Sequence, residues 1–172
     1  YSATTGDYGG LKMSPLYADE MVMQRQQPIV FRGTANAKER VEVNFNGQRL
    51  SAVTDTNGQW NVSFPAMDAG GPYEACITTK RRRLTIHHIY IGEVWLCSGQ
   101  SNMEYPVKAT TTAAEDEQLA AHLPLLHLYN MPTRFLTNAE KWPKTVLDSV
   151  NKLALLGGQT WQRASKETVS RF

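Results

Sequence analysis

The sequence predicts a mixed fold, in which an all-β sandwich is followed by the first part of an α/β domain. From about residue 10 to residue 90, apolar and polar residues alternate with a period of two. Near Ile89 this pattern gives way to a nearly continuous apolar run and then to a helical pattern. We therefore predict a sandwich domain over residues 1–89 and an α/β segment over residues 90–172.

The predicted sandwich depends on alternating runs that are separated by turn residues. The clearest runs are 41–45, 60–64 and 73–77, with earlier strands expected at 22–23 and 29–31. Asn46-Gly47 and Asn57-Gly58 lie between them. Asn-Gly pairs favour tight hairpins, because both central residues of such a turn take a positive φ. Short strands with a turn roughly every ten residues are typical of a two-sheet sandwich, here expected to be jelly-roll-like.

The predicted α/β segment begins with the apolar run Ile91–Cys97, as expected for a strand that is covered on both faces. A helix is expected over 113–122, because acidic residues fill its first turn and Pro124 follows its end. Residues 125–129 form the next predicted strand, and a further helix is expected around 145–155. Strand, helix and strand in this order indicate a parallel sheet. Two parallel strands cannot bury both faces, so we expect more polypeptide to complete the sheet.

The bulk properties exclude several classes of partner. The formal charge of +2 over 172 residues gives no reason to expect binding to nucleic acid or to a membrane surface. No apolar stretch approaches the roughly 20 residues that span a bilayer. The basic run 80–83 is interpreted as a solvated turn between two strands. Cys76 and Cys97 do not form a disulfide framework for a chain of this length, and Cys97 is expected to be a buried small side chain.

Gly99-Gln100-Ser101-Asn102-Met103 follows the apolar run and is the candidate for chemistry. A strand that ends in Gly-x-Ser places a hydroxyl at the carboxyl edge of a sheet, where open α/β sheets bind their ligands. Serine is a poor nucleophile until a base takes its proton. Residue 103 is Met, so the second glycine of the Gly-x-Ser-x-Gly nucleophile elbow is missing, which is evidence against a typical α/β-hydrolase. The alternative is a serine that caps the next helix.

With its surroundings, this segment resembles the SGNH hydrolase superfamily and, within it, the sialate O-acetylesterase family of carbohydrate esterases. The resemblance runs from Leu16 to about Pro132. It is carried by residues 19–25 (DEMVMQR), 57–60 (NGQW), 69–73 (AGGPY) and 92–103 (GEVWLCSGQSNM). It implies a β-sandwich followed by a flavodoxin-like catalytic domain.

The resemblance also implies the chemistry and the roles of the site residues. Ser101 would be the nucleophile, and its backbone N–H would contribute to the oxyanion hole. Gly99, Gln100 and Asn102 would support the nucleophile loop. The implied reaction removes acetyl groups from sugar hydroxyls, of sialate or a similar O-acetylated sugar, through an acetyl-serine intermediate. It requires no metal and no cofactor.

The general base implied by the resemblance is absent from this sequence. The family carries it in an Asp-x-x-His element near the end of the catalytic domain. The four histidines are His87, His88, His122 and His127, and the residues three positions before them are Leu84, Thr85, Leu119 and Pro124. None of these is a carboxylate. We therefore expect this chain to be inactive alone, with the base supplied by the rest of the precursor or by a second chain, such as the C-terminal part of the same precursor.

A second interpretation is a non-catalytic sandwich that binds carbohydrate or acts as a spacer. Trp60, Tyr73 and Tyr90 would then stack on sugar faces, although alternating aromatic residues more often belong to a core. The chain begins at Tyr1 rather than Met, so we expect that a preceding part was removed, either by a signal peptidase or in cloning. We expect the protein to be periplasmic or extracellular.

Overall fold

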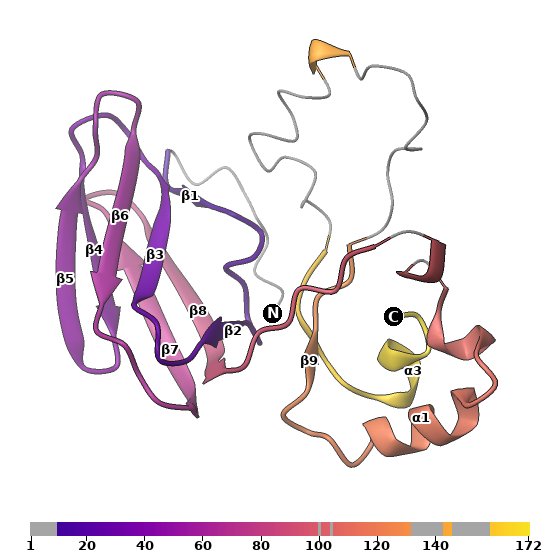
Figure 1. Ribbon diagram of the computed structural model, residues 1–172. Coiled ribbons are helices and arrows are strands. Elements are labelled where there is room, and N and C mark those ends of the chain that lie inside the picture. The colour runs from indigo at the N-terminus through magenta and orange to yellow at the C-terminus, as the bar shows by residue number, and fades with distance from the viewer. Residues whose placement is uncertain (1–9, 100, 104, 132–142, 146–158) are drawn as a thin grey trace. The chain divides into compact units, whose positions relative to one another are not determined.

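The computed structural model describes residues 10–99, 101–103, 105–131, 143–145 and 159–172. The chain divides into two compact units, Tyr1–Trp95 and Leu96–Phe172. The first contains the strands β1 to β8, and the second contains short helices with one small pair of strands (Figure 1).

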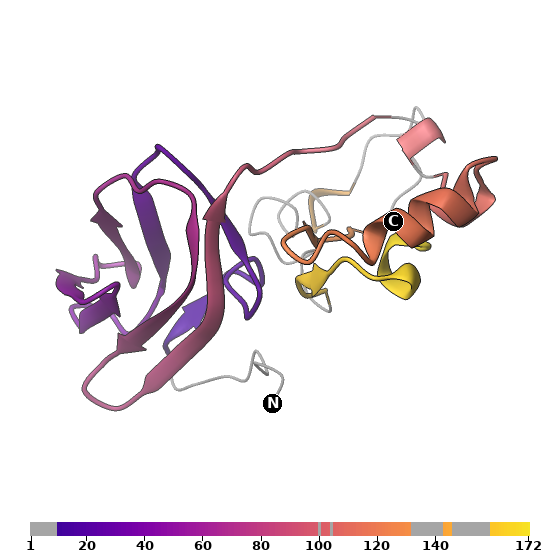
Figure 2. The same ribbon diagram turned by 90° about the horizontal axis from the view of Figure 1, so that it is seen from below.

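The first unit is built from two sheets, which Figure 1 and Figure 2 show from two sides. The larger sheet has the order β2 (Val22–Gln24), β8 (Arg83–Gly92), β7 (Gly70–Thr78), β4 (Arg40–Phe45) and β5 (Gln48–Val53). The smaller sheet has the order β1 (Lys12–Met13), β3 (Ile29–Thr34) and β6 (Gln59–Phe64). All neighbours are antiparallel except β2 and β8, which are parallel. The predicted β-rich first half is therefore confirmed.

The core lies between these two sheets and follows the predicted alternation. Successive residues of a strand point to opposite faces, so β6 buries Trp60, Val62 and Phe64 and exposes the residues between them. Phe31 of β3 is fully buried, and its ring centroid lies 5.3 Å from that of Phe45 in β4. Such tilted aromatic contacts add to the free energy gained by burying the rings.

The two Asn-Gly pairs have different roles. Asn46 and Gly47 take φ values of 47° and 72° and form the two-residue turn between β4 and β5, as predicted. Asn57-Gly58 precedes β6, which pairs with β3 rather than with β5. This second turn therefore carries the chain from one sheet to the other and does not close a hairpin.

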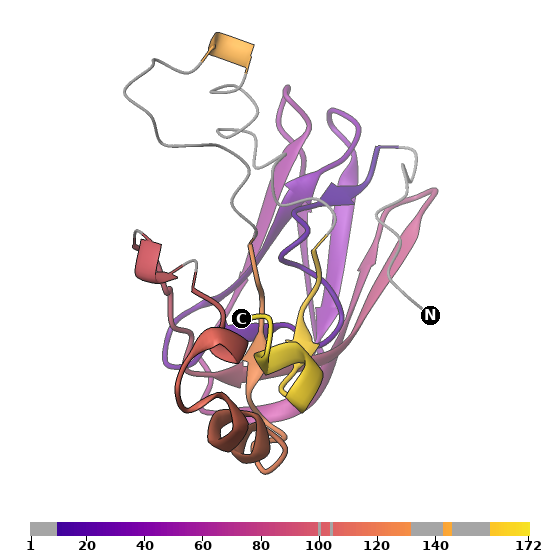
Figure 3. The same cartoon turned by 90° about the vertical axis from the view of Figure 1, so that its right-hand side faces the viewer.

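The second unit contains η1 (Ser101–Met103), η2 (Val107–Ala109), α1 (Ala113–Ala120) and α3 (Lys166–Val169). Lys166 of α3 forms an ion pair with Glu117 of α1 at 3.7 Å, and Figure 3 shows these two helices beside each other. The helix predicted over 113–122 is confirmed, with its end two residues earlier. Of the helix predicted around 145–155, all but residue 145 lie outside the described residues.

The strand predicted for Ile91–Cys97 is wrong for most of its length. β8 of the sandwich continues to Gly92, across the predicted boundary between residues 89 and 90, and residues 93–99 are exposed and form no strand. The compact units divide after Trp95. A strand that is covered on both faces needs neighbouring layers. The described residues supply none here, so Trp95 and Leu96 remain 83% and 93% exposed.

The strand predicted for 125–129 is present only as β9 (His127–Leu128). Its partner in the described part of the chain is β10 (Gln162–Arg163), and the two run antiparallel. The parallel pairing predicted between 91–97 and 125–129 is thus not formed by the described residues. The flavodoxin-like arrangement stays a prediction.

Candidate functional site

Ser101 is the first residue of the short helix η1, and its side chain is exposed. Asn102 and Met103 complete this turn and are also exposed. Gly99 lies just before it, where an added Cβ would come within 2.6 Å of Cγ of Met103. A glycine is therefore needed if the chain is to fold back this closely on Met103. Gln100, which the sequence assigned to the same loop, lies outside the described residues.

The segment that leads to Ser101 is anchored at its beginning by two side chains at the end of β2, those of Gln24, its last residue, and of Arg25, which follows it. Oε1 of Gln24 accepts a hydrogen bond of 2.9 Å from the backbone N–H of Val94. Nε2 of Gln24 donates to Glu93, and Nε of Arg25 forms an ion pair with the same carboxylate at 2.5 Å. The hydrogen bonds from Gln24 and Arg25 lower the pKa of Glu93 below its ordinary value. The end of β8 is thereby fixed just ahead of the exposed segment 93–99.

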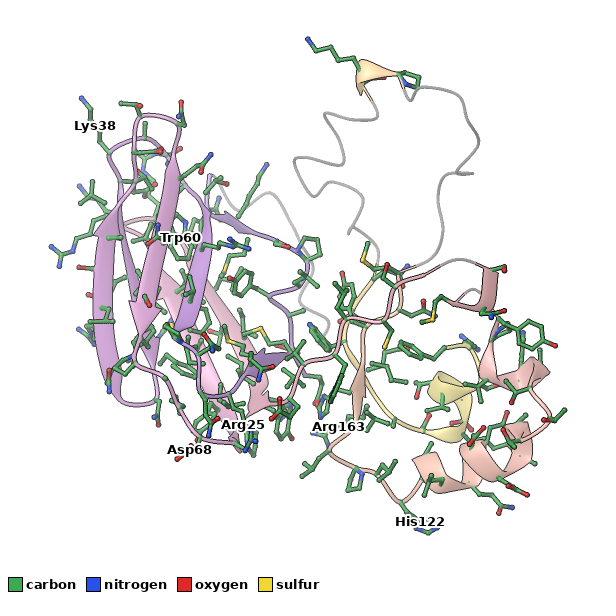
Figure 4. All side chains as sticks on the ribbon, viewed as in Figure 1. Arg25, Lys38, Trp60, Asp68, His122 and Arg163 are labelled. Atoms are coloured by element: carbon green, nitrogen blue, oxygen red, sulfur yellow. The ribbon has the colours of Figure 1, made fainter. Side chains whose placement is uncertain are left out.

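The hydroxyl of Ser101 is not joined to any histidine by a hydrogen bond within the described residues. Nδ1 of His87 lies 2.7 Å from Glu74, and Nδ1 of His88 lies 2.9 Å from Glu20, both within the sandwich. His122 follows the end of α1 (Figure 4), and His127 is buried in β9. The prediction that the base lies outside this chain stays a prediction.

The two histidine–carboxylate pairs of β8 were not identified from the sequence as a structural feature. The register between β7 and β8 shifts around Tyr73 and Ala75, which produces an irregularity opposite His87 and His88. His88 takes a φ of 54° there. The only sequence signal for this feature is the adjacent histidine pair itself, since a bulge depends on how two strands pair.

The aromatic residues proposed to stack on sugars do not form such a platform. Trp60 is only 4% exposed and belongs to the core, so its assignment to a sugar-binding face is wrong. The ring of Tyr73 packs against Phe45 with 5.7 Å between their centroids. Tyr90 is half-buried. These positions support the core interpretation of the alternating aromatic residues.

Both cysteines are free, and Cys97 is exposed rather than buried. The predicted burial of Cys97 is wrong because the strand that would have buried it is not formed. Cys76 is half-buried in β7, and its Sγ accepts a hydrogen bond of 2.9 Å from Nε of Arg83.

Among the described residues, no group of three or more His, Cys, Asp or Glu side chains lies close enough together to hold a metal ion. Among the same residues, no helix is both long enough and apolar enough to cross a membrane.

Comparisons with known proteins show that the chain is similar to part of several carbohydrate esterases. It matches no profile of a characterised protein family. The structure is similar to that of a carbohydrate acetylesterase from Xanthomonas citri, with a TM-score of 0.76 and 28% identity, over 94% of this chain and 34% of that one.

The curated proteins that the chain is similar to are sialate O-acetylesterases. The chain is 28% identical over 143 residues to the sialate O-acetylesterase of Rattus norvegicus, covering 77% of this chain and 26% of that protein. It is 33% identical over 73 residues to the sialate O-acetylesterase of Mus musculus, covering 40% of this chain and 14% of that protein. The predicted resemblance to the sialate O-acetylesterase family is thus confirmed. The chain spans about a quarter or less of the length of these curated relatives.

Proposed function

We propose that this chain is the nucleophile-bearing part of a serine carbohydrate O-acetylesterase, with Ser101 as the nucleophile. The observation that carries the proposal is the exposed hydroxyl of Ser101 at the start of η1, within the segment that carries the family resemblance. The relatives named above are esterases of acetylated sugars, which supports an O-acetylated sugar as the substrate. The interpretation as a non-catalytic module has no support from the aromatic residues on which it depended.

The proposed reaction proceeds in two steps. Oγ of Ser101 attacks the acetyl carbonyl carbon while a base takes the hydroxyl proton, and the resulting oxyanion is stabilised by backbone N–H groups that include that of Ser101. Collapse of this intermediate breaks the bond to the sugar oxygen, which leaves as a hydroxyl after receiving the proton. Water then attacks the acetyl-serine by the same route, which releases acetate and regenerates Ser101.

The base in this proposal is a histidine outside the chain, oriented by a carboxylate. It belongs to the C-terminal part of the same precursor, present as a second chain or as a continuation of this one. The proposal is supported by the sequence, in which no carboxylate stands three positions before any of the four histidines. Exposed apolar side chains in the second unit are consistent with a partner polypeptide that covers them.

The role of Ser101 as the nucleophile is tested with a fluorophosphonate probe, which reacts with activated serines. The sample is the natural protein that contains this chain, in its longest form. We expect covalent labelling of Ser101, identified by peptide mass spectrometry. We also expect Ser101→Ala to lower acetate release by about a thousandfold or more. Ser98→Ala, a change at an exposed serine of the same segment, is the matched control and should retain activity. Labelling of another residue, or an active Ser101→Ala variant, would contradict the proposal.

The source of the base is tested separately with the 172-residue chain alone. We expect no hydrolysis of a chromogenic acetate ester above the rate of the Ser101→Ala variant. Denaturing mass spectrometry of an active natural preparation should reveal either a longer chain or a second polypeptide. Full activity of the 172-residue chain by itself would show that the base is internal.

A further inference from the structure

Basic side chains gather at one end of the sandwich. We define the basic end by six residues, which are Lys38, Arg40, Lys80, Arg81, Arg82 and Arg83. All six are exposed. In Figure 4, Lys38 lies at one end of the sandwich and Asp68 at the other. The +2 formal charge of the whole chain conceals this local concentration.

The pairing of the strands brings these residues together although they come from two parts of the sequence. Arg40 is the first residue of β4, and Arg83 is the first residue of β8. Thr78, the last residue of β7, pairs with Arg83 on one side and with Glu42 of β4 on the other. The start of β4, the end of β7 and the start of β8 therefore lie at the same end of the larger sheet.

The turn that carries three of the cations is held by its own hydrogen bonds. The backbone N–H of Thr79 donates to the carbonyl oxygen of Arg82 at 2.8 Å. Oγ1 of Thr79 accepts a hydrogen bond of 3.2 Å from the backbone N–H of Arg82. Because these bonds fix the backbone of residues 79–82, the turn needs little further ordering when it binds a ligand.

Most cations of the basic end have no ion pair with a carboxylate in the described part of the chain, although the charge of Glu74 acts on Arg83. Arg83 donates to the Sγ atom of Cys76, and Nη2 of Arg40 donates to the hydroxyl of Ser51 at 2.8 Å. Within the described part of the chain, no ion pair joins Lys38 or any of residues 80–82 to a carboxylate.

Four carboxylates on or beside strands β4, β5 and β7 are engaged by other partners. Glu74 of β7 forms an ion pair with His87. Oε2 of Glu39 accepts two hydrogen bonds from Asn36, and Glu42 lies 3.4 Å from Nε of Arg49. Oδ1 of Asp55 accepts from the backbone N–H groups of Asn57 and Gln59. Like charges that are left close together repel one another, so an anion bound here would relieve that repulsion.

We propose that the basic end, which belongs to a different unit of the chain from Ser101, binds the carboxylate groups of an acidic glycan. The choice of an acidic glycan, rather than any other anion, rests on the proposed function, which acts on acetylated sugars. Arginine side chains suit this role, because the guanidinium fork can donate two parallel hydrogen bonds to one carboxylate.

A single-stranded nucleic acid fits this surface less well. Proteins that bind single strands combine positive charge with exposed aromatic rings on which the bases stack. Among the described residues of the sandwich, the large exposed apolar side chains include one aromatic ring, that of Trp95. Trp95 follows the end of β8, whereas Arg83 begins that strand, so the ring and the basic turn are at opposite ends of it.

Polysialic acid, a chain of carboxylated sugars, is the probe that tests this inference with the 172-residue chain. We expect binding that weakens as the salt concentration rises from about 50 mM to about 200 mM. Arg81→Ala/Arg82→Ala should lower the affinity about tenfold or more, since hydrogen bonds between two charged groups are lost. The matched control is Arg32→Ala/Arg49→Ala, which removes the same charge from exposed residues of β3 and β5 outside the basic end. Its affinity should stay within about twofold of wild type.

Three outcomes would overturn the inference: no binding of polysialic acid at low salt, equal losses in the two double variants, or tighter binding of single-stranded DNA of matched charge. Two separate measurements distinguish a failure of the proposed esterase activity from a failure of the proposed glycan binding. Acetate release from neutral 4-nitrophenyl acetate, measured in the natural preparation, requires no anion-binding surface. The binding measurement, repeated with Ser101→Ala, requires no nucleophile.

Discussion

Phe31 lies at the centre of the sandwich, where its ring contacts the rings of Phe45 and Phe64 at centroid distances of 5.3 and 5.9 Å. All three lie on strands of the sandwich, and each points inward because successive side chains of a strand point to opposite faces of its sheet. A second aromatic type shows the limit of such reasoning at the residue scale. Trp60 lies in the alternating run 60–64 and is 4% exposed, whereas Trp95 lies in the apolar run 91–97 and is 83% exposed. The sequence patterns around these two residues do not predict this difference in exposure.

Phe31→Ala should destabilise the sandwich by about 3–5 kcal/mol, because the substitution removes a fully buried ring and leaves a cavity. Leu50→Ala on β5 is the matched control, since Leu50 is 37% exposed, and it should cost less than about 1 kcal/mol. Urea unfolding of the two variants measures both values. A cost below about 1 kcal/mol for Phe31→Ala would contradict the assignment of the core.

Glu93 is expected to make stability depend on pH in the acidic range. Its pKa is lower in the folded chain than the ordinary value of 4.5, because Gln24 and Arg25 donate hydrogen bonds to the ionised carboxylate. Its contribution to stability is therefore present above pH 4.5 and is lost as the pH falls through the lowered pKa.

Glu93→Gln should remove this part of the pH dependence, so its melting temperature should decrease less than that of wild type on acidification. Asp68→Asn, at an exposed carboxyl of the same unit, is the control and should follow the wild-type curve. Thermal unfolding at several pH values below and above 4.5 provides the test. Parallel curves for wild type and Glu93→Gln would contradict it.

At the scale of elements, the smaller sheet depends on the absence of a side chain at one position of β3. Gly33 pairs with Met13 of β1, and a Cβ added to Gly33 would come within 2.2 Å of the carbonyl oxygen of Lys12. A flexible side chain can rotate away from such a contact, but a backbone carbonyl oxygen held in a strand pair cannot. β1 is only two residues long, so it has few other contacts with which to hold its place.

Gly33→Ala should therefore detach β1 from β3 and expose Leu11, which is 1% exposed in the folded chain. We expect faster hydrogen exchange of the backbone amides around residues 11–14 and a loss of stability of about 1–3 kcal/mol. Gly92→Ala is the control, because its added Cβ would meet only Cγ1 of Val22 at 3.5 Å, an ordinary contact. Unchanged exchange in the Gly33→Ala variant would show that β1 tolerates the side chain.

At the scale of the whole molecule, the two units differ in how much apolar surface they bury. In the described residues, every buried hydrophobic side chain except Ala120 lies between Leu11 and Ile91. The exposed large hydrophobic side chains of the second unit are Leu96, Met103, Tyr105, Leu119, Leu123, Leu125, Leu126, Met131 and Phe172. A stable domain needs a buried hydrophobic core. The first unit has such a core and is expected to fold alone, whereas the described part of the second unit has none.

Residues 10–95 expressed alone should unfold cooperatively, whereas residues 96–172 alone should bind the dye ANS and show no cooperative transition. Urea titrations followed by circular dichroism compare the two pieces. Cooperative unfolding of residues 96–172 by themselves would contradict this expectation and would mean that this unit forms its own core.

The sequence by itself determined what depends on neighbouring residues. The alternating strands 41–45 and 60–64, the turn at Asn46-Gly47 and the helix that begins at Ala113 were predictable, because side-chain period, turn geometry and helix-end charges are local properties. The choice of Ser101 as the nucleophile depended on the family resemblance of the segment around it, and that role stays a prediction.

Only the tertiary structure decided which strands join which sheet and which apolar residues are covered. The alternation of residues 60–64 does not reveal that β6 pairs with β3 and not with β5. Within the apolar run Ile91–Cys97, strand β8 ends at Gly92 and the side chain of Leu96 is exposed, although the same residues are typical of a buried strand. Burial is a property of what lies opposite a residue in space, and that partner is brought there by parts of the chain far away in sequence.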